Sequence, residues 1–191
     1  MNLILASTSP RRIELLRKFH IDFDVIPSNI TEPEPLQDED PISFAKKVSF
    51  LKASEVSSRI KRGIILGVDT IVEIDNIVLG KPKDRESAEY MLKLLSGKIH
   101  RVISGFTIIR YSTKVVKDAV ITTVKFRRLT EEEIQTYLDK ETYLDNAGAY
   151  AIQEEGSKLI EYIKGCYYNV MGLPIWRIME AIKFLKVEED R

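Results

Sequence analysis

The hydrophobic residues of this chain fall into two kinds of pattern, and each kind predicts one type of element. Short, nearly continuous apolar runs predict buried strands, and apolar residues spaced three and four apart predict helices. Strands are expected at residues 1–6, 23–27, 63–74, 77–79, 102–111, 115–126 and 159–163. Helices are expected at residues 10–19, 42–60, 85–95, 130–138 and 174–185. Because strands and helices alternate early and strand pairs follow, the pattern predicts an α/β fold with a mixed β-sheet flanked by helices.

Turn and capping residues mark where several of these elements begin and end. Asp75-Asn76 and Ser112-Thr113 each predict a hairpin between neighbouring strands. Thr130 and Glu133 have the spacing of a capping box, which predicts the start of a helix. Residues 31–41 are acidic and rich in proline, so we expect an exposed loop there.

The composition is that of an ordinary globular protein, and we expect one domain over residues 1–191. Lys plus Arg and Asp plus Glu number 29 each, and this zero net charge argues against a nucleic-acid or membrane-surface partner. Cys166 is the one cysteine, which excludes an internal disulfide and fits a reducing compartment. The chain has neither a bilayer-length apolar run nor the basic N-terminal segment of a secretory signal. We therefore expect a cytoplasmic protein.

Hydroxyl residues, a proline and two arginines follow the first predicted strand. Ser9 is well placed to cap the helix that Pro10 opens, because proline at the first helical position has no amide to leave unpaired. Arg11 and Arg12 then lie in the first turn, where the partial positive charge of a helix N-terminus disfavours cations. Together with Ser7 and the free amides, the two arginines predict an anion site. The alternative is a plain strand-to-helix turn with two solvated arginines.

Asp69 and Lys52 are charged residues at positions that the pattern predicts to be buried. Asp69 lies in an almost wholly apolar strand, where a carboxylate is costly unless it is paired, protonated or bound to metal. It is either a functional carboxylate or a structural one that amides or an arginine satisfy. Lys52 lies within the apolar arc of the 42–60 helix. Its ammonium could follow the surface out to solvent or enter a cleft, and the spacing favours neither.

Other polar residues carry weaker signals. Lys81, between Gly80 and Pro82, is held in a turn where a lysine can meet a phosphate, but many surface turns look the same. Glu32 lies in the acidic loop and is solvated by default. The sequence contains no phosphate-binding G-x-x-x-x-G-K-[ST] motif, no dinucleotide-binding glycine motif and no H-E-x-x-H zinc motif.

Taken in order, these segments closely resemble the Maf family of nucleoside triphosphate pyrophosphatases over nearly the whole chain. The matching motifs are Ser7-Thr8-Ser9-Pro10-Arg11-Arg12, Lys52-Ala53, Gly67-Val68-Asp69-Thr70, Leu79-Gly80-Lys81-Pro82, Leu95-Ser96-Gly97-Lys98, Ala147-Gly148-Ala149-Tyr150, Ile152-Gln153 and Gly172-Leu173-Pro174. The resemblance implies a fold like that of inosine triphosphate pyrophosphatases, with an active-site cleft between two lobes. It also implies hydrolysis of a nucleoside triphosphate to monophosphate and pyrophosphate, a divalent metal such as Mg²⁺ or Mn²⁺, and often a homodimer.

The same resemblance assigns roles to individual residues. Asp69 with Thr70, Arg12 and Gln153 look like the branch that acts on dTTP and UTP, extending to modified pyrimidine nucleotides. The resemblance implies that Asp69 is the catalytic proton acceptor and that Arg12, Thr70 and Gln153 take part in substrate choice. The polar cleft positions that bind substrate are matched by Ser7, Arg11, Lys52 and Lys81. Glu32 matches a loop carboxylate near the metal, so Glu32 and Asp69 are the expected metal ligands.

Two other classes of function compete with the enzyme. A non-catalytic nucleotide-sensing module would keep the anion site but would not need a carboxylate at position 69. An interaction protein associated with cell division would be expected to keep its role without Arg12 or Asp69. Turnover of a nucleotide in the presence of metal distinguishes the enzyme from the nucleotide-sensing module directly.

Overall fold

The computed structural model describes residues 2–60, 62–110, 114–140 and 143–187, which fold into two compact units. Unit 1 is built from residues 1–69, 104–120 and 172–191, and unit 2 from residues 70–103 and 121–171. The chain therefore passes from one unit to the other within its three long strands and once more in the turn at residues 171–172. The prediction of a single domain, and that of a cleft between two lobes, both stay predictions.

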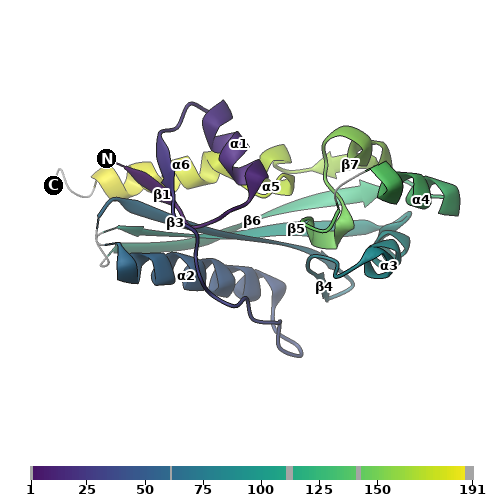
Figure 1. The fold of residues 1–191 in the computed structure, drawn as a ribbon, viewed down its shortest axis with the longest axis horizontal. Coiled ribbons are helices and arrows are strands. Elements are labelled where there is room, and N and C mark those ends of the chain that lie inside the picture. Colours follow the sequence, from purple (N-terminus) through teal and green to yellow (C-terminus); the bar gives the residue numbers. More distant parts are fainter. Residues whose placement is uncertain (1, 61, 111–113, 141–142, 188–191) are drawn as a thin grey trace. The chain divides into compact units, whose positions relative to one another are not determined.

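A seven-stranded mixed sheet runs through the fold (Figure 1). Its strands are β1 (Leu3–Leu5), β2 (Phe23–Val25), β3 (Ile64–Ile74), β4 (Ile77–Leu79), β5 (Ile99–Arg110), β6 (Lys114–Phe126) and β7 (Ile160–Lys164). They pair in the order β2-β1-β3-β5-β6-β7, and β4 pairs with β3. β1 is parallel to both β2 and β3, whereas the β3–β4 and β6–β7 pairs are antiparallel. The predicted α/β fold with a mixed sheet is confirmed.

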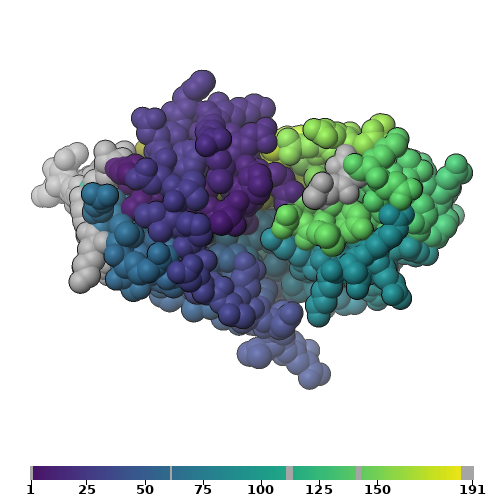
Figure 2. All heavy atoms as spheres, viewed as in Figure 1, coloured from purple at the N-terminus to yellow at the C-terminus, as the bar shows by residue number. Residues whose placement is uncertain are grey.

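The helices of unit 1 cover both faces of its strands. They are α1 (Pro10–Lys18), α2 (Pro41–Arg59) and α6 (Ile175–Val187). Figure 1 shows α1 and α6 on one side of these strands and α2 on the other. Apolar side chains from β1, α2, β3 and β5 form one core cluster between α2 and the sheet. The loop at residues 31–40 projects from the rest of unit 1, as the indigo atoms at the lower edge of Figure 2 show.

Two glycines and one hydroxyl pair place α2 directly on the strands. A Cβ built on Gly67 of β3 would lie 2.3 Å from the carbonyl oxygen of Ser49, and one on Gly105 of β5 would lie 2.4 Å from that of Ala45. Both distances are far below van der Waals contact, so only glycine allows this approach. The hydroxyls of Ser49 and Thr107 are both fully buried and lie 2.9 Å apart. The register of α2 on the sheet is therefore closely defined.

Unit 2 contains two longer helices, α3 (Arg85–Leu95) and α4 (Glu131–Lys140), and three short segments. These are the 3-10 turns η1 (Ala147–Ala149) and η2 (Glu154–Leu159) and the helix α5 (Tyr167–Val170). Its core gathers apolar residues from β3 to β7 and from both longer helices around the fully buried ring of Phe126. The buried His100 ring packs edge-on against Phe126, and its Nε2 lies 2.7 Å from the Tyr150 hydroxyl.

Most predicted elements are confirmed to within a few residues. Asp75 and Asn76 both have positive φ angles, 52° and 66°, which is the geometry of a tight hairpin turn. The predicted capping box is present, because the Glu133 amide donates to Thr130 Oγ1 and the Thr130 amide donates to the Glu133 carboxylate. The predicted Ser112-Thr113 turn and the start of the first predicted strand at Met1 lie outside the described residues.

One capping prediction is wrong. Ser9 lies at the N-cap position of α1, but within the described residues its side chain makes no capping hydrogen bond. Instead, the Ser9 amide donates to the hydroxyl oxygen of Ser7 at 3.2 Å, so the hydroxyl two residues earlier satisfies the backbone at this turn. The short segments η1, η2 and α5 were not predicted, because they are too short to show a helical period. None of the described helices combines the length and hydrophobicity that a membrane-spanning segment requires.

Candidate active site

The ammonium of Lys52 joins two carboxylates in unit 1. Its Nζ lies 2.8 Å from Asp69 Oδ1 and 2.8 Å from Glu32 Oε1. The side chains of Lys52 and Asp69 are only 10% and 9% exposed, whereas that of Glu32 is 58% exposed. Of the two readings for Lys52, the structure therefore selects the inward one. The sequence predicts a solvated Glu32. In the structure its carboxylate pairs with Lys52, and the rest of its side chain stays open to solvent.

Local structure explains why these three charged groups converge. Asp69 and Gly67 are two residues apart on β3, so both point to the face of the sheet that α2 covers. Because Gly67 lets the backbone of α2 approach closely at Ser49 and Ala53, Lys52 between them starts close to the sheet. Its four-carbon side chain then runs beside β3 to the Asp69 carboxylate. The ammonium thereby gives the buried carboxylate a charged partner, which offsets part of the cost of its burial.

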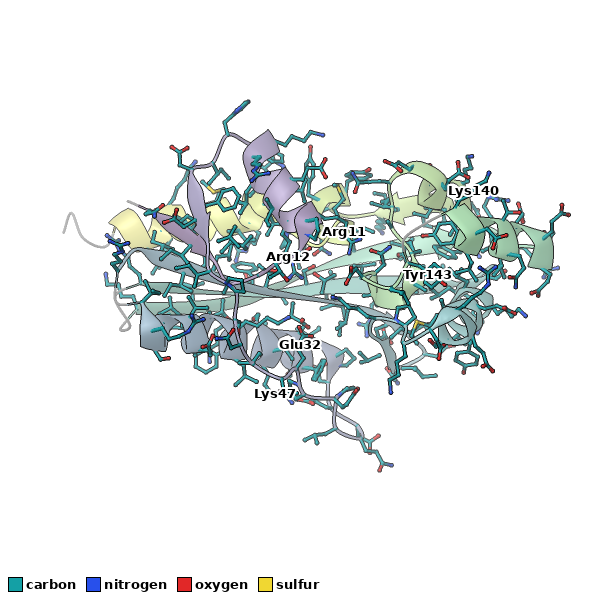
Figure 3. All side chains as sticks on the ribbon, in the orientation of Figure 1. Arg11, Arg12, Glu32, Lys47, Lys140 and Tyr143 are labelled. Atoms are coloured by element: carbon teal, nitrogen blue, oxygen red, sulfur yellow. The ribbon has the colours of Figure 1, made fainter. Side chains whose placement is uncertain are left out.

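The start of α1 contributes a second cationic group. Arg12 is buried, and its guanidinium donates from Nε to the carbonyl oxygen of Gly172 at 2.9 Å and from a terminal nitrogen to Ser7 Oγ at 3.1 Å. Burial lowers the pKa of Arg12 from its ordinary value, while the negative charges of Asp69 and Glu32 act in the opposite direction. Arg12 therefore interacts electrostatically with both carboxylates that Lys52 joins. Figure 3 shows Arg11 and Arg12 together at the first turn of α1.

Three of the predicted site residues belong to unit 2. Thr70 follows Asp69 on β3 and is half-buried. Lys81 is mostly exposed, and its Nζ lies 3.2 Å from Asp145 Oδ1. The turn that carries Lys81 is attached to η1, because the Gly148 amide donates to the Gly80 carbonyl oxygen at 3.0 Å. Gln153 is half-buried at the start of η2.

Several contacts of the candidate residues and their elements were not predicted. The Gly172 carbonyl that holds Arg12 lies 160 positions away in the sequence, and no local pattern indicates that pairing. Asp145, the partner of Lys81, is similarly distant from it along the chain. The Ser49–Thr107 hydroxyl pair joins α2 to β5 and leaves no signature in either segment. Periodicity detects faces of elements, whereas these contacts depend on how distant elements meet.

The candidate donors for a divalent metal are the two carboxylates that Lys52 joins. Among the described residues, no group of three or more histidine, cysteine, aspartate or glutamate side chains is arranged to hold an ion. Glu32 and Asp69 nevertheless direct carboxylate oxygens at one cation, the Lys52 ammonium. Mg²⁺ in nucleotide enzymes is commonly held by one or two carboxylates together with substrate phosphates, and not by a protein cage. The two carboxylates fit that kind of metal site.

Comparison with known proteins places this chain in a family. Residues 2–185 match the profile of the family described as Maf-like protein. The chain belongs to the Maf family. Three Maf relatives named dTTP/UTP pyrophosphatase cover nearly all of it. The relative from Thermosipho africanus is 47% identical over 182 residues, which are 95% of this chain and 92% of the relative. Those from Clostridioides difficile and Pyrococcus furiosus are each 44% identical, and cover 96% and 95% of this chain and 94% of each relative.

Solved structures outside this close group show weaker similarity. A structure described as nucleoside-triphosphatase / dITP/XTP pyrophosphatase from Mycobacterium abscessus superposes with a TM-score of 0.45 and is 14% identical. It covers 68% of this chain and 76% of the other. The Ham1 protein of Staphylococcus aureus superposes with a TM-score of 0.46 at 11% identity, covering 66% of this chain and 72% of the other.

Proposed function

We propose that this Maf protein is a nucleoside triphosphate pyrophosphatase that hydrolyses the α–β phosphoanhydride of dTTP and UTP. The products are a nucleoside monophosphate and pyrophosphate. The relatives named dTTP/UTP pyrophosphatase, which share 42–47% of their residues with this chain, support the activity and its substrates. The observation that carries the proposal is the Lys52 ammonium held between the Asp69 and Glu32 carboxylates, with the buried Arg12 guanidinium in their field.

Asp69 is the proposed proton acceptor. Its carboxylate orients a water molecule and takes one proton from it as the water oxygen forms a bond to the α phosphorus. The bond between the α phosphorus and the bridging oxygen breaks, and pyrophosphate leaves with that oxygen. A divalent cation such as Mg²⁺ or Mn²⁺, held by Glu32 and Asp69, would supply charge neutralisation for the phosphates.

Binding of the triphosphate depends mainly on positive charge and oriented donors. A nucleoside triphosphate carries about four negative charges, and catalysis of phosphoryl transfer is largely positioning and electrostatic stabilisation. Arg11, Arg12, Lys52 and Lys81 are the proposed cationic partners, and the Ser7 hydroxyl and the amides at the start of α1 are further donors.

Selectivity for a pyrimidine base is assigned to polar side chains. Thr70 and Gln153 are proposed to hydrogen-bond the base edge, and Arg12 to help set the orientation of the nucleotide. A site of this kind rejects a wrong base because its own polar groups are then buried without partners. The half-buried positions of Thr70 and Gln153 are compatible with that role, since each side chain is neither sealed in the core nor fully solvated.

The experiment is a pyrophosphate-release assay on purified protein with dTTP, UTP and the other common nucleoside triphosphates, with Mg²⁺ or Mn²⁺. The Asp69→Asn variant keeps the shape of the side chain but removes its charge and basicity. We expect its turnover to fall by at least about a hundredfold. Asp75→Asn, the same change in an exposed hairpin turn, should leave turnover unchanged.

Two results would count against the proposal. Near-normal release by Asp69→Asn would remove Asp69 from the chemistry. Tight nucleotide binding by the wild-type protein without any turnover would favour a nucleotide-sensing module.

A further inference from the structure

The Lys52 ammonium occupies the position between two carboxylates that a metal would share. We propose that Lys52 is the resident cation of the nucleotide-free protein, and that divalent metal reaches Glu32 and Asp69 together with the nucleotide. In that step the Lys52 ammonium leaves the two carboxylates and pairs with the triphosphate. This inference rests on the proposed function, because Glu32 and Asp69 are the metal ligands only under that proposal.

The distances show that Lys52 serves both carboxylates equally. Its Nζ lies 2.8 Å from an oxygen of each, so one ammonium provides a charged hydrogen bond to both. With Asp69 and Lys52 almost fully enclosed, this is a tightly held arrangement and not a loose surface pair. Removing a partner from such a group leaves a buried charge uncompensated, which strongly disfavours an empty state. A resident cation is therefore needed whenever no metal is present.

The charge balance disfavours a metal that arrives alone. Glu32 and Asp69 carry two negative charges, which Lys52 and the nearby Arg12 already balance. A divalent ion added to this neutral group would leave two uncompensated positive charges beside the buried Lys52–Asp69 pair. When the ion arrives with a nucleotide, the about four negative charges of the triphosphate more than offset it. The charge balance of the site therefore favours binding of the metal–nucleotide complex over binding of the free metal ion.

Lysine is suited to such an exchange of partners. Its ammonium is a compact charge on a flexible stem, so it can move between acceptors while its backbone stays in place. The backbone of Lys52 is held firmly, because α2 contacts the sheet at Ser49 on one side of it and at Ala53 on the other. Only the end of the side chain has to move. Arg12, in contrast, donates hydrogen bonds to Gly172 and Ser7 and to neither carboxylate in these bonds.

The direct test measures Mn²⁺ binding to the nucleotide-free protein through the electron paramagnetic resonance signal of free Mn²⁺. We expect weak binding by the wild type and about tenfold tighter binding by Lys52→Met, which removes the competing cation. Lys52→Arg keeps a positive charge and should bind as weakly as the wild type. The double variant Lys52→Met/Asp69→Asn should not show the tighter Mn²⁺ binding of Lys52→Met. Circular dichroism checks that each variant is folded.

Lys47 on the same helix provides a matched control. It also forms an ion pair, with Glu39 at 2.6 Å, but it does not touch Glu32 or Asp69. Figure 3 labels both Lys47, on α2, and Glu32, in the loop that precedes α2. Lys47→Met should bind Mn²⁺ like the wild type. An equal gain in Lys47→Met would mean that net charge alone is responsible and would overturn the proposal.

A second measurement tests the order of binding. Initial rates measured at a fixed concentration of metal–nucleotide complex should not rise with added free metal. A rate that requires free metal first, or micromolar Mn²⁺ affinity in the nucleotide-free wild type, would overturn the inference. The Mn²⁺ titration contains no nucleotide, so its outcome is separate from that of the proposed function. Product analysis alone decides whether the protein is a pyrophosphatase.

Discussion

Gly67 on β3 lies directly against Ser49 on α2. A Cβ at position 67 would be 2.3 Å from the Ser49 carbonyl oxygen and 2.8 Å from the Ala53 amide nitrogen. Both neighbours are backbone atoms of a helix, so neither can turn aside as a side-chain end could. Lys52 lies between these two contacts along the helix. The absence of a side chain at position 67 therefore helps to set how far the Lys52 ammonium reaches toward Asp69.

The Gly67→Ala variant tests this relationship. The added methyl group has to push α2 away from β3, and such overpacking of a core costs about 1–3 kcal/mol of stability. Because the shift separates Lys52 from Asp69, we also expect lower turnover than the loss of stability alone explains. Urea unfolding and pyrophosphate release at a temperature where the variant is folded measure the two effects.

Gly80→Ala is the control for that substitution. A Cβ on Gly80 would meet no heavy atom within 4 Å, so its free energy of unfolding should stay within about 0.5 kcal/mol of the wild type. Equal stability of the Gly67 and Gly80 variants would show that α2 can move without cost. The close contact would then have no part in positioning Lys52.

The position of Lys52 shows how far periodicity can predict the site. The spacing of Ala45, Val48 and Val56 correctly places Lys52 on the buried face of its helix. It does not say which way the ammonium points, because that depends on a partner outside the helix. One of its two partners, Glu32, lies in the 31–41 loop, where proline-rich sequence predicts exposure but no particular path. The structure supplies that path.

Arg12 illustrates a second limit. The local pattern predicts two arginines in the first turn of a helix and treats them alike as part of an anion site, and only the family resemblance gives them different roles. The structure separates them, because Arg12 is buried and held by the Gly172 carbonyl, which belongs to the turn before α6. Contacts between elements so far apart in the chain depend on the packing of the whole unit. Strand and helix positions, in contrast, follow from local patterns and were predicted to within a few residues.

Substitution of Arg12 should change substrate selectivity as well as rate. Arg12→Lys keeps the charge but loses the guanidinium geometry that bonds to both Gly172 and Ser7. We expect the preference for dTTP and UTP over purine triphosphates, as a ratio of kcat/KM values, to fall by about tenfold or more. Arg12→Ala should show a larger fall in rate with the same change in preference.

Arg17→Ala, in the exposed last turn of the same helix, is the control and should keep the wild-type preference. If kcat/KM fell by the same factor for all nucleotides in the Arg12 variants, Arg12 would be a phosphate contact without a role in selectivity.

The buried His100 makes stability depend on pH in a defined window. Burial lowers the pKa of His100 to about 4, compared with about 6.5 in the unfolded chain. Between these values the unfolded chain binds a proton that the folded protein does not bind. The stabilising contribution is therefore fully present above about pH 6.5 and is lost as the pH falls toward about 4.

Replacing His100 by glutamine should remove this dependence. Between about pH 6.8 and pH 5, the wild type should lose about 1–2 kcal/mol more stability than His100→Gln, as measured by urea unfolding at each pH. The exposed His20 provides the control, and His20→Asn suits its positive φ of 52° and should keep the wild-type slope. An equal slope in wild type and His100→Gln would show that His100 does not titrate as a buried base.

In the proposed reaction, water attacks the α phosphorus of dTTP or UTP. Hydrolysis of dTTP in water enriched in ¹⁸O, with both products analysed by mass spectrometry, tests it most directly. We expect dTMP and pyrophosphate in equal amounts, with one ¹⁸O atom in dTMP and none in pyrophosphate. Label in pyrophosphate, or dTDP and phosphate as the products, would contradict it.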